Sequence, residues 1–385
     1  MKVTGLEPYI VRVRFIGPTL PYVWSGGERT GAESLLIALS TDEGIDGWGE
    51  TSPPLPSGST KTLVKAVYSP LVVGEDPFEI GCILEKLSNL GSPEIAAGIE
   101  MALWDIVGKA TGLPLCRMLG GPIRDRVPLA GCMGIKDPED AARTAREYVA
   151  QGFHTVKTKG GRDAQWDIEV VRAIREAVRA DVQIRLDANQ GYTPDQALRL
   201  LRDLEPYDLQ FFEQPCRKAL LEETAQLRLR ARVPIALDEG VDTTEELLRA
   251  VRLASLDVAV VDIPPAGGVL KVRDMAAIAE AAGIPLVMGS AHEMGVKTAA
   301  MLHIVASIPA FRYASDSTYY AQQNDVLTEP LRVWDGTIEV PMRPGLGVEV
   351  DREKVRACEM SGASRPWRSV PQSGTSSGTA GFAKS

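Results

Sequence analysis

Beyond about residue 127, short apolar runs alternate with longer amphipathic segments at a spacing of roughly 25 residues. Strands that alternate with helices in this way predict a parallel (β/α) barrel of the TIM type. A doubly wound open sheet is the alternative, but no Gly-x-Gly-x-x-Gly motif follows the first strand, and evenly spaced units favour closure. The eight apolar runs lie at 127–134, 155–159, 184–189, 209–214, 234–239, 258–263, 285–290 and 311–316.

The chain before the barrel follows a different pattern. Residues 1–15 and 33–49 read as strands, with a turn at 42–44 inside the second segment. Helical patterns follow at 60–72, 77–89 and 93–110. We therefore expect an α+β unit in this part of the chain.

These patterns divide the chain into four parts. We expect the α+β unit over 1–125 and the barrel, as catalytic domain, over 126–330. Residues 331–363 begin with strand and turn patterns and are expected to return to the N-terminal unit. Residues 364–385 are rich in Ser and Gly and should lack a packed core.

Composition and charge narrow the class of protein. The 385 residues carry 42 Lys and Arg against 51 Asp and Glu, and the net charge of −9 argues against a nucleic-acid or anionic-membrane partner. No apolar stretch approaches the ~20 residues that a membrane-spanning helix needs, and we expect no signal peptide. Five cysteines without a Cys-x-x-Cys pair indicate reduced thiols and a cytoplasmic protein.

Three carboxylates occupy equivalent places at the ends of successive predicted strands. Asp187, Glu213 and Asp238 are separated by 26 and 25 residues, which is about one strand–helix unit each. Such carboxylates would repel one another unless a cation neutralised them. The chain has only three histidines, so these oxygen ligands must hold any metal, and they favour Mg²⁺, with Mn²⁺ as the alternative.

Two lysines end the second predicted strand on the same face. Lys157 and Lys159 are two residues apart, and side chains two apart on a strand point the same way. Paired lysines opposite a metal predict abstraction of a proton next to a substrate carboxylate. We expect Lys159 to be the base and Lys157 to lower its pKa and help hold the carboxylate.

These motifs, taken in order, resemble the mandelate racemase/muconate-lactonising enzyme group of the enolase superfamily. The resemblance covers residues 1–350 and rests on GWGE (47–50), Lys157-x-Lys159, DAN (187–189), EQP (213–215), DE (238–239) and GG (267–268). It implies an α+β capping domain over the barrel, one Mg²⁺ and an enolate intermediate. It also implies a small carboxylate substrate and a homo-oligomer, either a dimer or an octamer.

The resemblance assigns further residues. Loops of the capping domain around 17–30 and 51–60 should close over the substrate, with Tyr22 and Trp24 as candidate lid residues. Counted from Pro234, Asp238 matches the third ligand of the muconate-lactonising branch, and Glu239 matches that of the mandelate racemase branch. We expect Asp238 to be the ligand and Glu239, like Asn189, to lie just outside the ligands.

The chain departs from these relatives on the face opposite Lys159. Relatives of the muconate-lactonising branch carry a lysine on the sixth strand, where this chain has Asp262 as the only titratable residue at that rim. Mandelate racemase pairs such an aspartate with a histidine, but here that position is Gly289. His292 is a candidate substrate contact and the alternative partner of Asp262, and Glu293 matches the glutamate of the muconate-lactonising branch. We expect Asp262 to act as the second acid/base, with Glu293 as a further candidate catalytic residue.

These assignments predict a Mg²⁺-dependent isomerase that abstracts the proton α to a carboxylate and gives racemisation, epimerisation or cycloisomerisation. Loss of a β-hydroxyl from the same intermediate would make the protein a lyase, a dehydratase of a hydroxy acid or acid sugar. A non-catalytic ligand-binding descendant is the third hypothesis, which the intact ligands and lysines oppose.

Overall fold

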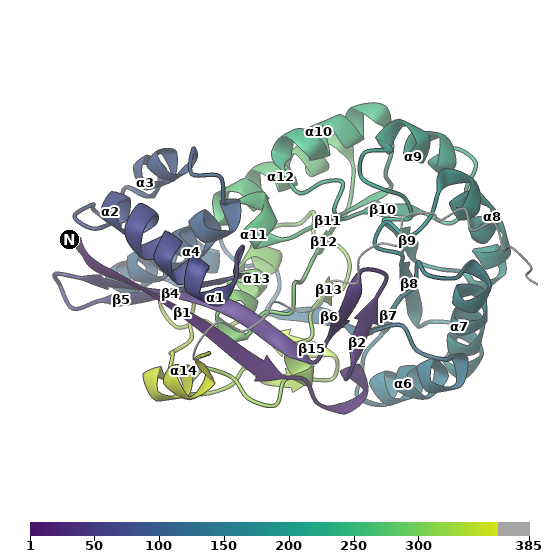
Figure 1. Cartoon of the computed structure of the whole chain (residues 1–385), viewed down its shortest axis with the longest axis horizontal. Coiled ribbons are helices and arrows are strands. Elements are labelled where there is room, and N and C mark those ends of the chain that lie inside the picture. Colours follow the sequence, from purple (N-terminus) through teal and green to yellow (C-terminus); the bar gives the residue numbers. More distant parts are fainter. Residues whose placement is uncertain (361–385) are drawn as a thin grey trace, which may run out of the picture.

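A computed structural model describes residues 1–360, and the expected Ser/Gly-rich tail lies outside the described residues. The central feature is a ring of eight parallel strands (Figure 1). Pairing of the last strand with the first closes the ring, together with a bridge between Leu286 and Phe311. The strands are β6 (Arg126–Met133), β7 (Thr155–Lys159), β8 (Gln183–Asp187), β9 (Phe211–Glu213), β10 (Ile235–Leu237), β11 (Val258–Val261), β12 (Leu286–Met288) and β13 (Ser315–Asp316). The predicted barrel is confirmed.

Helices on the outside of the ring connect its strands (Figure 1). Their starts carry local signals, since Thr193 and Thr243 each form a capping box with the residue three positions later. The helices are α6 (Pro138–Ala150), α7 (Ala164–Ala177), α8 (Pro194–Leu204), α9 (Leu221–Arg228), α10 (Thr244–Leu253), α11 (Ile263–Ala266), α12 (Val269–Ala282) and α13 (Gly295–Ser307), with 3₁₀ turns η3 (Glu205–Tyr207) and η4 (Tyr319–Ala321).

The N-terminal α+β unit packs against one side of the barrel (Figure 1). Its antiparallel sheet has the order β1 (Val3–Arg14), β4 (Gly31–Thr41), β5 (Asp46–Thr51). A separate hairpin, β2 (Tyr22–Trp24) with β3 (Gly27–Arg29), follows the 3₁₀ turn η1 (Gly17–Thr19) and extends towards the barrel. The helical elements of this capping domain are α1 (Ser57–Leu63), η2 (Val64–Tyr68), α2 (Ser69–Val72), α3 (Ile80–Leu87), α4 (Pro93–Thr111) and α5 (Leu115–Met118).

The segment after the barrel differs from the expectation. Its first part, β14 (Val333–Trp334) and β15 (Thr337–Glu339), adds antiparallel to the barrel strand β6 instead of joining the N-terminal sheet. Only the later part returns to the capping domain, where Leu346 donates its backbone N–H to Asp105 and helix α14 (Arg352–Cys358) packs on β1. The first residues of β6, 126–128, lie beyond its pairing with β7 and β13, which explains the difference, because their backbone groups are left for β15 to pair with.

No helix among residues 1–360 is both long enough and apolar enough to cross a membrane.

Two buried glutamates of the capping domain bind the N-termini of two barrel helices. Glu50, the last residue of the GWGE motif, accepts from the backbone N–H groups of Met294 and Lys297 at the start of α13, at 2.6 and 2.8 Å. Glu100 of α4 accepts from the backbone N–H of Leu270 in α12 at 3.0 Å. A carboxylate is stabilised at a helix N-terminus, where N–H groups lack partners within the helix. These contacts join the two domains.

Glu100 also explains the second glycine of the GG motif. Gly268 has a φ of +129°, and a Cβ on it would lie 1.6 Å from Oε2 of Glu100. Only glycine accommodates both the backbone conformation and the nearby carboxylate.

Because of Glu100, we expect the free energy of unfolding to fall as pH rises. Burial raises the pKa of Glu100 to about 7, against the partial compensation of the Trp104 indole and Leu270 N–H bonds. Because the pKa of Glu100 is higher in the folded state than in the unfolded state, folding takes up a proton at pH values between the two pKa values. The contribution of Glu100 to the free energy of unfolding is therefore fully present below about pH 4.3. It is lost as pH rises through about 7, by up to about 1.4 kcal/mol per pH unit. Denaturation curves from pH 4 to 8 should therefore show a steeper decline for the wild type than for Glu100→Gln.

The exposed Glu85 of α3 provides the control, and Glu85→Gln should follow the wild-type pH dependence. Parallel pH dependences for wild type and Glu100→Gln would contradict the assignment.

Candidate active site

Strand register brings the predicted ligands and lysines to one end of the ring. Lys159 stands opposite Asp187 in the β7–β8 pair, and Asp187 stands opposite Glu213 in the β8–β9 pair. Glu213 pairs with Ala236 of β10, so Asp238 follows two residues further along that strand direction. Catalytic groups of (β/α) barrels lie at this carboxyl end.

Lys157 lies among three carboxylates. Its Nζ is 2.6 Å from Glu213 Oε1, 2.6 Å from Asp316 Oδ2 and 3.2 Å from Asp187 Oδ2. Burial opposes the ammonium form, but the three carboxylates outweigh it and raise the pKa of Lys157 well above its usual value. Lys157 therefore remains a fixed positive charge in this arrangement.

Lys159 contacts Asp187 and Asn189. Its Nζ lies 2.5 Å from Asp187 Oδ2 and donates to Asn189 Oδ1 at 2.8 Å. Burial and the neighbouring Lys157 both lower the pKa of Lys159, as expected, but Asp187 reverses the balance and raises that pKa above its usual value. The expectation of a net lowering by Lys157 is therefore wrong for this arrangement, because the Asp187 carboxylate is closer to Lys159 than was foreseen.

The candidate ligands fit an oxygen-bound divalent cation in their chemistry. Glu213 Oε2 is buried and has no hydrogen-bond partner, and burial together with the neighbouring Asp187 raises the pKa of Glu213 well above its usual value. Burial and the charges of Glu239 and Glu213 do the same to the pKa of Asp238. Surplus negative charge of this kind is what a cation would relieve. Within residues 1–360, however, no three potential ligands converge into a ready-made metal site, because lysine ammonium groups lie between the carboxylates.

Neighbouring amides support this rim. Asn189 donates from Nδ2 to Glu239 Oε1 at 3.2 Å and from its backbone N–H to Asp187 Oδ1 at 2.9 Å. The place of Asn189 and Glu239 just outside a ligand set stays a prediction. Gln214 accepts at Oε1 from the backbone N–H groups of Asp238 and Gly240, each at 3.0 Å. Gln214 has a φ of +36°, a conformation that turns the chain sharply after Glu213. These bonds orient the ends of β9 and β10.

A second charged group lies across the ring, where β11 is four strands away from β7. Lys297 of α13 is buried, and its Nζ lies 2.7 Å from Asp262 Oδ1 and 2.9 Å from Glu293 Oε2. The expectation that Asp262 stands alone is therefore wrong. A lysine from a neighbouring element, 35 residues later in the chain, reaches it.

His292 is turned away from Asp262. Its Nδ1 forms a 2.9 Å hydrogen bond with the Thr318 hydroxyl, and its ring meets the Tyr22 ring edge-on at 4.3 Å. Burial and the nearby Arg29 and Lys159 charges hold the pKa of His292 well below its usual value. The alternative of a His292–Asp262 pair is therefore wrong for this structure, because Thr318 and Tyr22 hold the ring elsewhere.

The β2–β3 hairpin covers the carboxyl end of the barrel. Tyr22 is buried beside a cavity of about 40 Å³ that Lys157, Lys159, Asp238 and His292 also line. Trp24, the other candidate lid residue, is half-buried and stacks with Arg29 at 5.3 Å. Three hydrogen bonds tie the hairpin to barrel loops: Ser25 Oγ to Asn189 O, Arg29 Nη1 to Ala291 O, and Arg162 Nη2 to Trp24 O. The contact of the 51–60 loop with substrate stays a prediction.

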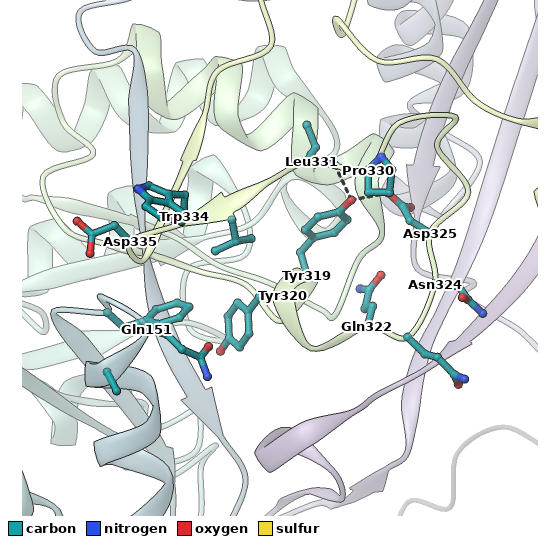
Figure 2. Close-up of a pocket in the computed structure, with 14 residues that line it drawn as sticks. Gln151, Tyr319, Tyr320, Gln322, Asn324, Asp325, Pro330, Leu331, Trp334 and Asp335 are labelled. Atoms are coloured by element: carbon teal, nitrogen blue, oxygen red, sulfur yellow. Dashed lines mark hydrogen bonds between the residues drawn. The ribbon is translucent and has the colours of Figure 1, made fainter.

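A larger cavity of about 750 Å³ lies elsewhere, between the end of α6, η4 and β14. Figure 2 shows Tyr319, Tyr320 and Trp334 around it, with the Tyr319 hydroxyl bonded to Asp325 and the backbone of Leu331. Neither candidate base nor any candidate ligand is among its lining residues. The small cavity at the strand ends is therefore the catalytic candidate.

Sequence reasoning missed three charged residues. Arg185 and Asp316 form a 3.0 Å ion pair inside the ring, and Asp316 also binds Lys157. An arginine within the apolar strand of 184–189 was the available signal for the first. For Lys297 the signal was a single cation in the otherwise apolar helical run after residue 294, which predicts a buried ion pair.

Comparisons with known proteins agree with this arrangement. Residues 9–120 match the family model described as the mandelate racemase/muconate lactonizing enzyme N-terminal domain, and residues 140–355 match that of the enolase C-terminal domain-like family. Both matches fall on the capping domain and barrel described above.

Similar proteins cover several reactions. The chain is 28% identical to an N-succinyl-L-Arg/Lys racemase of Bacillus cereus over 92% of this chain and 97% of that protein. It is 32% identical to a cis-3-hydroxy-L-proline dehydratase of Roseibium aggregatum, over 85% and 91%. A dipeptide epimerase of Cytophaga hutchinsonii, solved with Mg and the dipeptide D-Ala-L-Val, superposes with a TM-score of 0.88 at 26% identity, over 93% and 99%.

We expect Gly134→Ala to displace the hairpin. A Cβ on Gly134, just after β6, would lie 2.3 Å from the backbone N of Val23, closer than atoms can pack. Proteolysis within 20–30 should become faster and Trp24 fluorescence should shift, while far-ultraviolet circular dichroism stays unchanged. Gly81→Ala on α3, where a Cβ has open space, should change neither signal. Equal proteolysis in both variants would show that the hairpin is not docked through Gly134.

Proposed function

The chain belongs to the mandelate racemase/muconate lactonizing enzyme group of the enolase superfamily, and on this premise we propose that it racemises or epimerises a small carboxylic acid. Enzymes of this group remove a proton α to a carboxylate and form an enolate in a Mg²⁺-dependent step. The observation that carries the proposal is the position of titratable groups on opposite sides of the ring, Lys159 on β7 and Asp262 after β11. Inversion at carbon needs one proton-transferring group on each face.

Asp187, Glu213 and Asp238 are the residues we propose as ligands of Mg²⁺, with Mn²⁺ as a substitute. When bound, such a cation polarises the substrate carboxylate and lowers the energy of the enolate. Lys157 holds the substrate carboxylate as a fixed positive charge. Tyr22 and the hairpin exclude water from the cavity, which strengthens these electrostatic interactions.

A cation held by Asp187 would compete with the Lys159 ammonium for that carboxylate and favour the neutral amine. In that form, Lys159 takes the α-proton from its side of the cavity. The C–H bond breaks, an N–H bond forms at Nζ, and the electron pair enters the enolate. Asn189 fixes the Nζ position through its 2.8 Å hydrogen bond. Return of a proton to the other face completes inversion. Loss of a β-hydroxyl from the same enolate is the second candidate, which the similarity to a dehydratase supports.

The net charge of −9 disfavours a nucleic-acid or anionic-membrane partner. It does not oppose a small carboxylate, because a divalent cation held in the site would reverse the local sign of the charge. We propose assembly into a homo-oligomer, which sedimentation of the full chain tests.

Solvent deuterium incorporation tests the reaction. We expect the enzyme with Mg²⁺ in D₂O to label both enantiomers of one class within a panel of N-acyl amino acids, dipeptides and hydroxy acids, read by mass. Lys159→Met should abolish labelling from one enantiomer because its base is removed. Loss of water from the labelled acid identifies a dehydratase instead. Absence of labelling across the whole panel would contradict the proposed racemisation.

Metal binding tests the ligand assignment without substrate. We expect Glu213→Gln and Asp238→Asn each to weaken Mn²⁺ binding by at least about tenfold, measured by electron paramagnetic resonance of free Mn²⁺. The matched variant is Glu239→Gln, which keeps side-chain length and should stay within about threefold of wild type. Weaker binding by Glu239→Gln than by Asp238→Asn would make Glu239 the third ligand.

A further inference from the structure

Two carboxylates share one ammonium group at the wall of the catalytic cavity. Lys297 contacts Asp262 Oδ1 and Glu293 Oε2, and all three side chains are at most 9% exposed. We call Asp262, Glu293 and Lys297 the β11 rim trio. Two negative charges and one positive charge leave this trio with a surplus negative charge that no other described ion pair neutralises.

The trio adjoins the cavity at two places. Gly289 lines the cavity, and a Cβ there would lie 3.4 Å from the Cβ of Asp262, so Asp262 lies directly beside a residue of the cavity wall. Ser290 lines the same cavity and donates to Glu293 Oε2 at 2.9 Å. Asp262 accepts its bonds from Lys297 and the Ile263 N–H at Oδ1, so neither of these bonds occupies Oδ2.

Within the trio, the ammonium is fixed and a carboxylate titrates. Burial opposes the charge of Lys297, but Asp262 and Glu293 outweigh it and raise the pKa of Lys297 above its usual value. Burial raises the pKa of Asp262 to about 6, against the opposing effect of Lys297 and with the help of Glu293. A group that titrates near neutrality can hold or release a proton during turnover, whereas the ammonium cannot.

We propose that Lys297 is a positioning residue for the second face of the active site, where its ammonium orients Asp262 through Oδ1 and governs when Asp262 carries a proton. This deepens the proposed function and rests on it. Relatives of the muconate-lactonising branch place a lysine on the sixth strand. Here the cation comes from α13, and the sixth strand supplies the carboxyl group.

Asp262 supplies the proton that returns to the second face of the substrate carbon. After Lys159 has taken the α-proton, the protonated carboxyl of Asp262 gives its proton to the opposite face of the enolate carbon. The O–H bond breaks and the C–H bond forms with the electron pair of the enolate, which leaves an Asp262 carboxylate. The Lys297 ammonium lies 2.7 Å from Asp262 Oδ1, so the negative charge formed on Asp262 is stabilised by a neighbouring positive charge. The reverse reaction uses Asp262 as the base.

Several other charged groups face the trio. Glu50 of β5 binds the backbone N–H of Lys297, and burial raises the pKa of Glu50 to about 7. Asp325 accepts from the Gly295 N–H, at the start of the same helix. His292 lies on the Glu293 loop, and Lys157 and Lys159 lie across the cavity. Glu50 titrates in a similar range, so its signal must be separated from that of Asp262.

A titration without substrate tests the proposal. The full chain with Mg²⁺ is labelled with ¹³C at aspartate carboxyl carbons only, which leaves Glu50 and Glu293 silent, and Asp262→Asn assigns the Asp262 signal. We expect Asp262 to titrate between about pH 5 and 7 in the wild type and at least about one unit higher in Lys297→Met, which removes the charge but keeps the chain length. Lys297→Arg should restore a value within half a unit of wild type.

An unchanged Asp262 titration in Lys297→Met, or a wild-type value near the ordinary 3.9, overturns the proposal whether or not a substrate has been found. Should Lys297→Met fail to fold, Glu293→Gln replaces it. Removing the competing carboxylate should then lower the pKa of Asp262 by at least about one unit, and no change overturns the proposal.

Exchange in D₂O separates this proposal from the proposed function. With a substrate that the wild type labels, Lys297→Met should lose at least about tenfold in labelling from the enantiomer opposite to that lost in Lys159→Met, with a displaced pH profile. Equal labelling of both enantiomers by Lys297→Met overturns the proposal while leaving the proposed racemisation intact. A wild type that labels nothing contradicts the proposed function, and the titration still decides the part played by Lys297.

Discussion

Burial of unequal numbers of opposite charges is the constraint that organises this molecule. At the strand ends, Asp187, Glu213 and Asp316 surround Lys157, and across the ring two carboxylates share Lys297. Each buried charge is costly unless paired, so the positions of the side chains are strongly interdependent. The barrel supplies the register that makes pairing possible, and the surplus negative charge makes the site receptive to a cation and to protons.

The capping domain helps to position these buried charges through backbone contacts. Glu50 binds the N–H groups of Met294 and Lys297 at the start of α13, the helix that supplies Lys297 to the β11 rim trio. The hairpin that bears Tyr22 belongs to the same domain and lies over the cavity. One domain therefore both orients the charged helix and closes the cavity, so a relative displacement of the domains would disturb chemistry and solvent exclusion together.

The strand-end residues could be predicted from the sequence because a period of about one strand–helix unit places them on one rim. Asn189 and Glu239 followed from their neighbours in the chain. Lys297 could not be placed, because its contact with Asp262 depends on how α13 packs against the ring. The orientation of His292 was also undetermined, since Thr318, from the segment after β13, decides it. Similarly, the pairing of β15 with β6 depends on which sheet edge is left open.

The contact between Gly268 and Glu100 has a consequence for how such a sequence can change over generations. A side chain at position 268 would overlap the Glu100 carboxylate, and a shorter residue at position 100 would remove an acceptor from the start of α12. Neither position can vary freely while the other is kept. Descendants of this chain that keep Glu100 and this backbone conformation should therefore also keep Gly268, which makes the pair a mark of how the two domains are docked.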